Sequence, residues 1–136
     1  MIYISTAVRA IAIVLVSVHS IACQSLEPAH SDDPIVGIYY LAKVDGSAVP
    51  ADVDHDGVTL HVRSGMMIIS EDGTCFSRTR FVDPGGTEQV RENDARYRVE
   101  ESRLIMNWEG AGVTTGVIDD TSLTMNNHGI MFEYRR

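Results

Sequence analysis

The chain has 136 residues, with 11 Lys and Arg against 19 Asp and Glu, and a formal net charge of −8 at pH 7. This length leaves room for one domain, and the acidic balance opposes binding to nucleic acid or to anionic lipid surfaces. Val, Ile, Thr and Tyr are frequent, and Gly recurs between short apolar alternations, which is the composition of pleated strands. We therefore expect an all-β domain.

Residues 1–22 have the features of a cleavable signal peptide. Arg9 precedes an apolar run over residues 10–18, and small side chains follow at positions 20 and 22. The run is shorter than the roughly 20 apolar residues of a membrane-spanning helix. Cleavage before Cys23 fits ordinary signal peptidase, but it also fits a bacterial lipobox, in which Cys23 would be acylated. We predict export to the cell envelope, with the protein lipid-anchored through Cys23 and facing the periplasm, or else soluble in the periplasm or secreted.

Residues 23–34 read as a flexible tether, because they are polar, contain Pro28 and have no apolar periodicity. Residues 35–136 then form the domain. The segment before Cys23 contains one Arg and no acid, so the remaining chain has ten Lys and Arg against 19 acids and a formal charge of −9. If Cys23 is not acylated, it is available for a disulfide with Cys75 in an oxidising compartment.

From residue 34 onward, strand patterns alternate with turn signals to the end of the chain. The predicted strands cover residues 35–44, 58–63, 66–70, 74–81, 96–100, 104–108, 113–118, 123–125 and 130–134. Tight turns separate them, except that residues 87–93 are expected to form a polar loop. Eight or nine short strands without a helix predict a small antiparallel up-and-down meander. Such a meander closes into a barrel or packs as a sandwich to protect its edges.

Strand alternation also predicts which side chains face the interior. The predicted interior consists of Tyr39, Leu41, Val58, Leu60, Val62, Met67, Ile69, Phe81, Tyr97, Val99, Leu104, Met106, Val117, Leu123, Met125, Ile130 and Phe132. Trp108 continues the parity of the strand that contains Met106, and we expect it near one barrel mouth. The candidate ligand contacts are Tyr39, Leu60, Met67, Tyr97, Met106, Trp108, Met125 and Phe132. The Met side chains either fill the core or line a deformable pocket.

Several short motifs together resemble the lipocalin-like domains of small bacterial envelope lipoproteins. They are residues 37–41 (GIYYL), 44–46 (VDG), 49–50 (VP), 72–74 (DGT), 97–99 (YRV) with Leu104, and 129–136 (GIMFEYRR). The likeness covers residues 35–136. Two positions depart from the family's pattern: Tyr39 stands where Trp is usual, and Cys75 replaces an aromatic residue after the turn at 72–74. The resemblance implies a lipocalin-like barrel of about eight strands whose interior holds an apolar ligand, with no catalytic residues to carry over.

The acidic segment 52–57 (DVDHDG) has the spacing with which a calcium loop begins. Alternate carboxylates of Asp52, Asp54 and Asp56 would converge on a cation in a turning loop, and Gly57 would permit the bend. The bidentate Glu that completes such a loop is absent, because Arg63 stands at its position. We therefore expect a solvated acidic loop, with these three aspartates only a weak metal candidate.

Basic side chains are concentrated in the middle of the chain, at Arg78, Arg80, Arg91, Arg96, Arg98 and Arg103. On paired strands several of them would share an outer face, where they would either hold an anionic polymer or form cross-strand ion pairs with the interleaved acids. The interleaving favours ion pairs.

The histidines show no spacing typical of a metal triad or of a nucleophile–base pair, so we expect a protein that is not an enzyme and has no cofactor. The sequence favours a barrel that binds a small apolar molecule. The alternative is an envelope interaction module whose barrel is fully packed, and the volume inside the barrel discriminates between the two.

Overall fold

The computed structural model describes residues 35–136, which form ten β-strands and no helix. The strands are β1 (Gly37–Val44), β2 (Ser47–Ala48), β3 (Ala51–His55), β4 (Val58–Ile69), β5 (Thr74–Val82), β6 (Glu88–Glu100), β7 (Arg103–Trp108), β8 (Gly112–Ile118), β9 (Ser122–Asn127) and β10 (Ile130–Arg135). No helix in this part of the chain is long and apolar enough to cross a membrane. The predicted signal peptide (1–22), the tether (23–34) and Cys23 lie outside the described residues.

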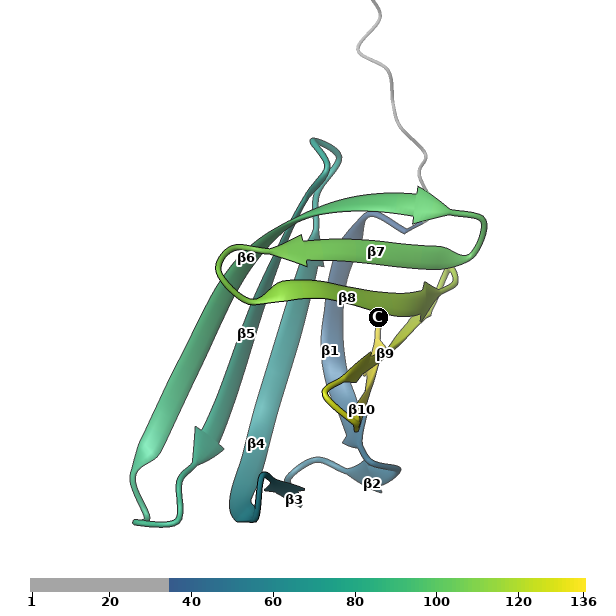
Figure 1. Ribbon diagram of the computed structural model, residues 1–136. Helices are drawn as coiled ribbons and strands as arrows, with labels where there is room; N and C mark the ends of the chain where they lie inside the picture. The colour runs from purple at the N-terminus through teal and green to yellow at the C-terminus, as the bar shows by residue number, and fades with distance from the viewer. Residues whose placement is uncertain (1–34) are drawn as a thin grey trace, which may run out of the picture.

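Eight of the strands close into an antiparallel barrel (Figure 1). Each strand from β4 to β10 pairs with the next one along the chain, β10 pairs with β1, and β1 returns to pair with β4. The short strand β2 pairs with β1, and β3 adds to β4. This strand order confirms the predicted up-and-down meander closing into a barrel of about eight strands, the architecture that lipocalins share.

One half of the barrel interior is filled by a close-packed apolar core. Its most deeply buried members include Tyr39, Met67, Leu104, Met106 and Leu123, all with no exposed surface. The hydroxyl of Tyr39 donates a hydrogen bond of 2.8 Å to the carbonyl of Ile35, so this buried polar group is satisfied. These side chains therefore form the hydrophobic core of the barrel.

Three residues of the predicted interior face solvent instead. Val58 and Val99 are each 42% exposed and lie at strand ends, while Val117 is 58% exposed on β8. On β8 the inward positions are Thr114, Gly116 and Ile118, the opposite parity to the one predicted. The prediction for β8 was wrong because it placed the Val117 side chain inside the barrel. Strand β9 approaches the inner face of β8 so closely that the position next to Val117 is occupied by Gly116, which has no side chain.

Strands β4 and β6 depart most from the lengths that the sequence pattern predicted. Strand β4 runs continuously through Ser64 and Gly65, where a register shift between Val62 and Ser64 marks a bulge and not a strand end. Residues 88–93, predicted as a polar loop, form the first half of β6 and pair with β5. Five of these six residues are polar and Val90 is exposed, because the faces of this half-strand are not buried in the core.

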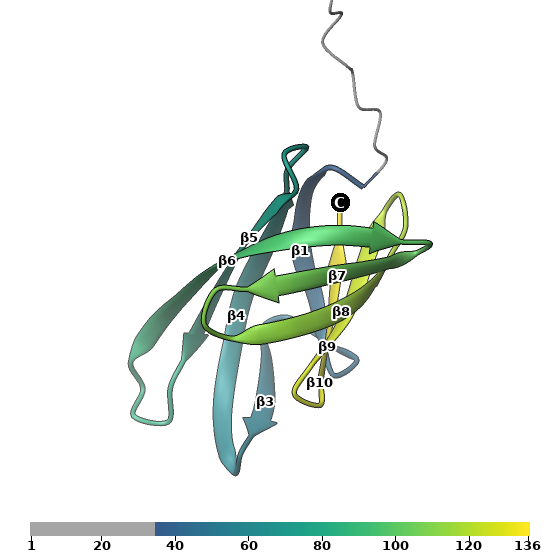
Figure 2. The same cartoon turned by 45° about the horizontal axis from the view of Figure 1, so that its top comes forward.

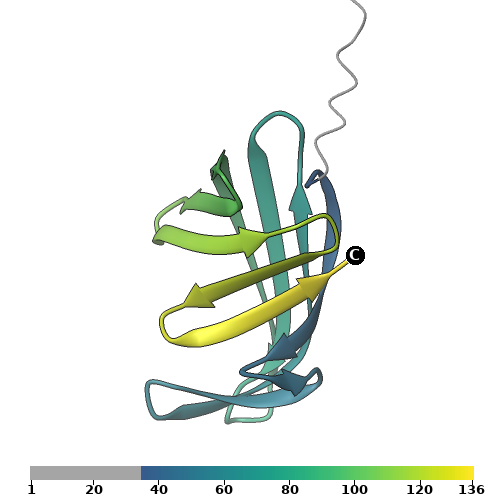
Figure 3. The same ribbon diagram turned by 90° about the vertical axis from the view of Figure 1, so that its right-hand side faces the viewer.

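The barrel wall opens at the end opposite the packed core. The β6–β7 ladder begins only at Ala95 and Trp108, so the earlier residues of β6 pair with β5 alone. The β5–β6 and β3–β4 hairpins extend away from the strands of the β7–β10 group (Figures 1 and 2). Figure 3 shows the β9–β10 hairpin on the side of this opening.

Candidate ligand-binding cavity

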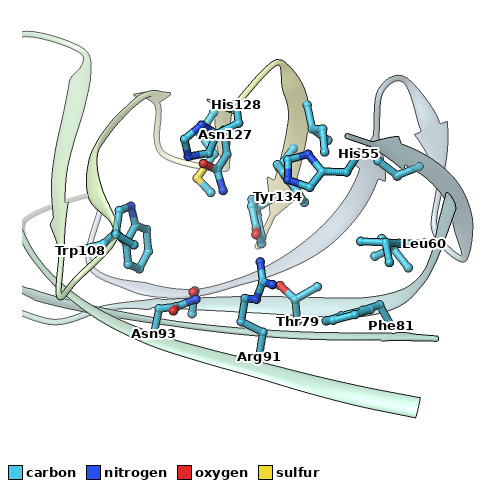
Figure 4. Close-up of a pocket in the computed structure, with 17 residues that line it drawn as sticks. His55, Leu60, Thr79, Phe81, Arg91, Asn93, Trp108, Asn127, His128 and Tyr134 are labelled. Carbon is cyan, nitrogen blue, oxygen red and sulfur yellow. The ribbon is translucent and has the colours of Figure 1, made fainter. Parts of the chain in front are cut away.

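A cavity of about 300 Å³ occupies the open half of the barrel. Strands β3–β6 form one wall, and Trp108, Ala111 and the β9–β10 hairpin form the other (Figure 4). The lining side chains are those of Val53, His55, Leu60, Val62, Ser77, Thr79, Phe81, Arg91, Asn93, Trp108, Ala111, Met125, Asn127, His128, Ile130, Phe132 and Tyr134. The volume is about ten times the ~30 Å³ that a water molecule occupies in the liquid, so a ligand of roughly ten to fifteen heavy atoms fits.

The β5–β6 wall is polar along its centre. Alternation directs Ser77 and Thr79 of β5 into the barrel, and the register places Asn93 and Arg91 of β6 directly opposite them. Phe81 continues the inward parity of β5 and carries the guanidinium of Arg91 over its ring, at 5.8 Å from the ring centroid. This wall therefore presents a strip of hydrogen-bonding groups beside an aromatic surface.

The β9–β10 hairpin supplies the opposite wall. Phe132 and Tyr134 of β10 stack with their ring centroids 6.4 Å apart. The turn between the strands places His128 in the left-handed region with φ of 52°, and the side chain of Asn126 accepts a hydrogen bond of 2.9 Å from the Gly129 N–H. This turn holds Asn127 and His128 at the cavity (Figure 4).

Tyr134 brings a buried hydroxyl into the cavity wall. Burial raises the pKa of Tyr134, although its hydrogen bond with Thr79 opposes that rise. The hydroxyl therefore stays protonated, and in Figure 4 it points toward the guanidinium end of Arg91. Tyr134 was absent from the predicted interior, although it has the same strand parity as Phe132, which was included.

Trp108 forms one side of the cavity. Its indole N–H donates a hydrogen bond of 3.1 Å to the Thr114 hydroxyl, and its side chain is 8% exposed. Trp108 is the only Trp in the chain, so its fluorescence reports on this cavity alone.

Half of the candidate ligand contacts meet in the cavity. Leu60, Trp108, Met125 and Phe132 line it. Tyr39, Met67 and Met106 lie in the packed half, and the hydroxyl of Tyr97 donates a hydrogen bond of 2.7 Å to the Ser70 carbonyl. Alternation assigns a face of the sheet but gives no position along the barrel axis, so it cannot separate packed side chains from lining ones.

The arginines of the predicted outer stripe divide into two groups. Outside the barrel, Arg78 pairs with Glu92 at 2.6 Å, Arg80 with Glu88 at 3.0 Å, and Arg98 with Glu100 at 2.9 Å. Arg91 departs from this stripe because it lies on the inner face of β6, opposite Thr79. Sequence reasoning missed this placement because residues 88–93 have no apolar alternation and were assigned to a loop.

The acidic segment does not form the loop that a cation would need. Asp52 and Asp54 both lie on the exposed face of β3. Because the strand is extended, their carboxylates do not converge on one point. Asp52 contacts the His61 ring at 2.6 Å, and Asp54 accepts a hydrogen bond of 2.6 Å from the Thr59 hydroxyl. Asp56 occupies the turn to β4. Within residues 35–136, no group of three or more His, Cys, Asp or Glu side chains is arranged to hold a metal ion.

Cys75 faces the core, as its strand parity predicts. Burial, with a contribution from the Asp94 charge, raises the pKa of Cys75 to about 12. The side chain therefore remains a neutral thiol at physiological pH. Since the thiolate is the nucleophile in cysteine chemistry, Cys75 is an inert packing residue in this fold.

No family model matches the chain, and comparison with curated proteins finds no match. Among solved structures, the chain is similar to a lipocalin-like protein from Bacteroides uniformis ATCC 8492, with 12% sequence identity and a TM-score of 0.48. The alignment covers 76% of this chain and 98% of that chain. The barrel architecture follows from the strand pairing of the chain itself.

Proposed function

We propose that this protein is a non-catalytic binding protein of the cell envelope, exported and lipid-anchored through Cys23, that holds a small, largely apolar molecule in its barrel. The observation that carries the proposal is the cavity of about 300 Å³ in the open half of the barrel. Sites for small molecules are concave, mostly apolar and furnished with a few polar groups, and this cavity has that character.

The size of the cavity sets the affinity that we expect. Ligands of about a dozen heavy atoms gain on the order of 0.5 kcal/mol per atom, which corresponds to a dissociation constant of roughly tens of micromolar. An interaction module with a fully packed barrel is less well supported, because the packed core extends over only one half of the interior.

The test uses Trp108 emission and thermal unfolding. Adding decanol, decanoate or a small aromatic alcohol is expected to shift Trp108 emission because Trp108 lines the cavity. A ligand at ten times its dissociation constant adds about 1.4 kcal/mol to the free energy of unfolding, which raises the Tm of a domain this size by roughly 4–8 °C.

Asn127→Phe fills part of the cavity and is expected to weaken binding. Asn107→Phe places the same ring on the exposed outer face of β7 and serves as the matched control, with wild-type binding. If no member of the ligand panel changes the emission or the Tm of the wild-type protein, the binding proposal is wrong.

A further inference from the structure

The cavity carries a net positive charge in a protein that is strongly acidic overall. Of the described residues that line it, Arg91 alone has a permanently charged side chain, and none is Asp or Glu. The chain as a whole has a formal charge of −8. The permanent charge that the lining presents to an occupant is therefore positive, and it attracts an anionic group.

Arg91 has no ion-pair partner among the described residues, in contrast to its neighbours. Arg78 and Arg80 on the facing strand are each paired with a Glu of β6. The contact that Arg91 makes is with the ring of Phe81, over which its guanidinium lies. This cation–π contact, 5.8 Å from the ring centroid, uses none of the guanidinium N–H donors in a hydrogen bond, so they can bind an anion.

The groups around the guanidinium are hydrogen-bonding and uncharged. Figure 4 shows the Arg91 side chain rising into the cavity beside Thr79, with the Tyr134 hydroxyl above it and Asn93 on the same wall. The pKa of Tyr134 is raised by burial, so its hydroxyl is protonated and able to donate to an anion at this point.

Apolar side chains flank this polar centre. Leu60 and Phe81 lie on one side of Arg91 and Trp108 lies on the other (Figure 4). Strand register places Val53 opposite Leu60 and Val62 opposite Phe81, which enlarges the apolar surface at the β3–β4 end. A ligand that satisfies both parts of the cavity combines one charged group with an apolar body.

Resting on the proposed function, we propose that the occupant is a medium-chain organic anion, whose single carboxylate binds Arg91 and whose apolar body lies against Leu60 and Phe81. One guanidinium balances one negative charge, which favours a monoanion over a phosphate dianion. The absence of carboxylates from the lining residues disfavours cations and zwitterions, since their positive group would lie near Arg91 without a counter-charge. The volume admits an acid of about ten to fifteen heavy atoms, the size of decanoate.

The experiment compares three ligands that share one alkyl chain: decanoate, decanol and decylammonium. Their affinities are measured by titration calorimetry at low salt, below micelle-forming concentrations, with wild-type protein, Arg91→Gln and Arg96→Gln. Arg96 lies on the outer face of β6, so Arg96→Gln removes the same charge from the same strand without touching the cavity. Unchanged Tm values establish that the variants are folded, as expected for exposed side chains.

We expect the wild-type protein and Arg96→Gln to bind decanoate at least about fivefold more tightly than decanol, with decylammonium weakest. The preference is modest because Arg91 remains open to solvent, and it decreases as salt is added. In Arg91→Gln, decanoate is expected to bind no more tightly than decanol. If decanol binds but decanoate has no Arg91-dependent advantage, the anion inference is wrong while the proposed function stands. If none of the three binds, the proposed function itself is wrong.

Discussion

A single glycine decides which face of β8 lies inside the barrel. A Cβ atom at Gly116 would lie 2.8 Å from Leu123 Cδ1 and 3.1 Å from the Thr124 carbonyl oxygen. Strands β8 and β9 therefore approach each other so closely at Gly116 that a Cβ atom fits only if neighbouring atoms shift. The adjacent Val117 side chain points outward. Hydrophobicity alone places Val117 inside, which is why the sequence pattern misassigned this strand.

Gly116→Ala is expected to lower the free energy of unfolding by about 1–3 kcal/mol, because backbone and a fully buried Leu123 side chain must move to admit the methyl group. Urea unfolding measures the change. Val117→Ala alters the adjacent, exposed position and is expected to stay within about 0.5 kcal/mol of wild type. Equal effects of the two substitutions would contradict the inward assignment of Gly116.

Among the elements, the β5–β6 hairpin connects fold and site. Its inner face supplies Thr79, Arg91 and Asn93 to the cavity, while its outer face carries the ion pairs of Arg78 and Arg80. The turn between the strands is organised by Asp83, whose carboxylate accepts hydrogen bonds of 2.9 Å from the Thr87 N–H and 3.2 Å from the Gln89 side chain. These hydrogen bonds hold the pKa of Asp83 below its ordinary value.

Asp83→Ala is expected to speed amide exchange over residues 84–93 and to weaken decanol binding about two- to fivefold, since the cavity wall loses its turn. Asp119 makes equivalent hydrogen bonds to the Thr121 and Ser122 N–H groups between β8 and β9, away from the cavity lining. Asp119→Ala should loosen its own turn while leaving the ligand affinity at the wild-type value. A loss of affinity in both variants would show that the effect reflects general destabilisation.

The hairpins also show how far sequence reasoning extends. Turn chemistry at residues 71–73 and 83–86 was predicted correctly, because Asp, Gly and Pro act locally through their own hydrogen bonds and dihedral angles. The first half of β6 was missed, because polar residues adopt a strand there through pairing with β5 and not through burial. The same gap concealed Arg91, so the predicted contacts include four residues that line the cavity, Leu60, Trp108, Met125 and Phe132, but not its charged residue.

At the scale of the whole molecule, the cavity extends from the middle of the barrel, at Ser77, toward the end opposite the start of the domain. Gly37 pairs with Ile69 at one end of β4, while Leu60 lines the cavity nine residues earlier, about 30 Å away at ~3.3 Å per residue. Figure 3 shows the chain entering β1 at the end away from the β3–β4 hairpin.

Membrane association is expected to depend entirely on Cys23. The chain after residue 22 has a formal charge of −9, so an anionic lipid surface repels the domain and electrostatic attraction cannot replace a covalent lipid. In a bacterial host, the wild-type protein is expected in the membrane fraction, to resist a high-salt wash, and to have an intact mass that includes acyl chains on Cys23. Cys23→Ser should move the protein to the soluble fraction while decanol still raises its Tm by the wild-type increment, because Cys23 is not among the residues that line the cavity. An unmodified chain beginning at Cys23, or wild-type protein recovered wholly from the soluble periplasm, would disprove lipid anchoring and leave the binding proposal to be judged on the cavity alone.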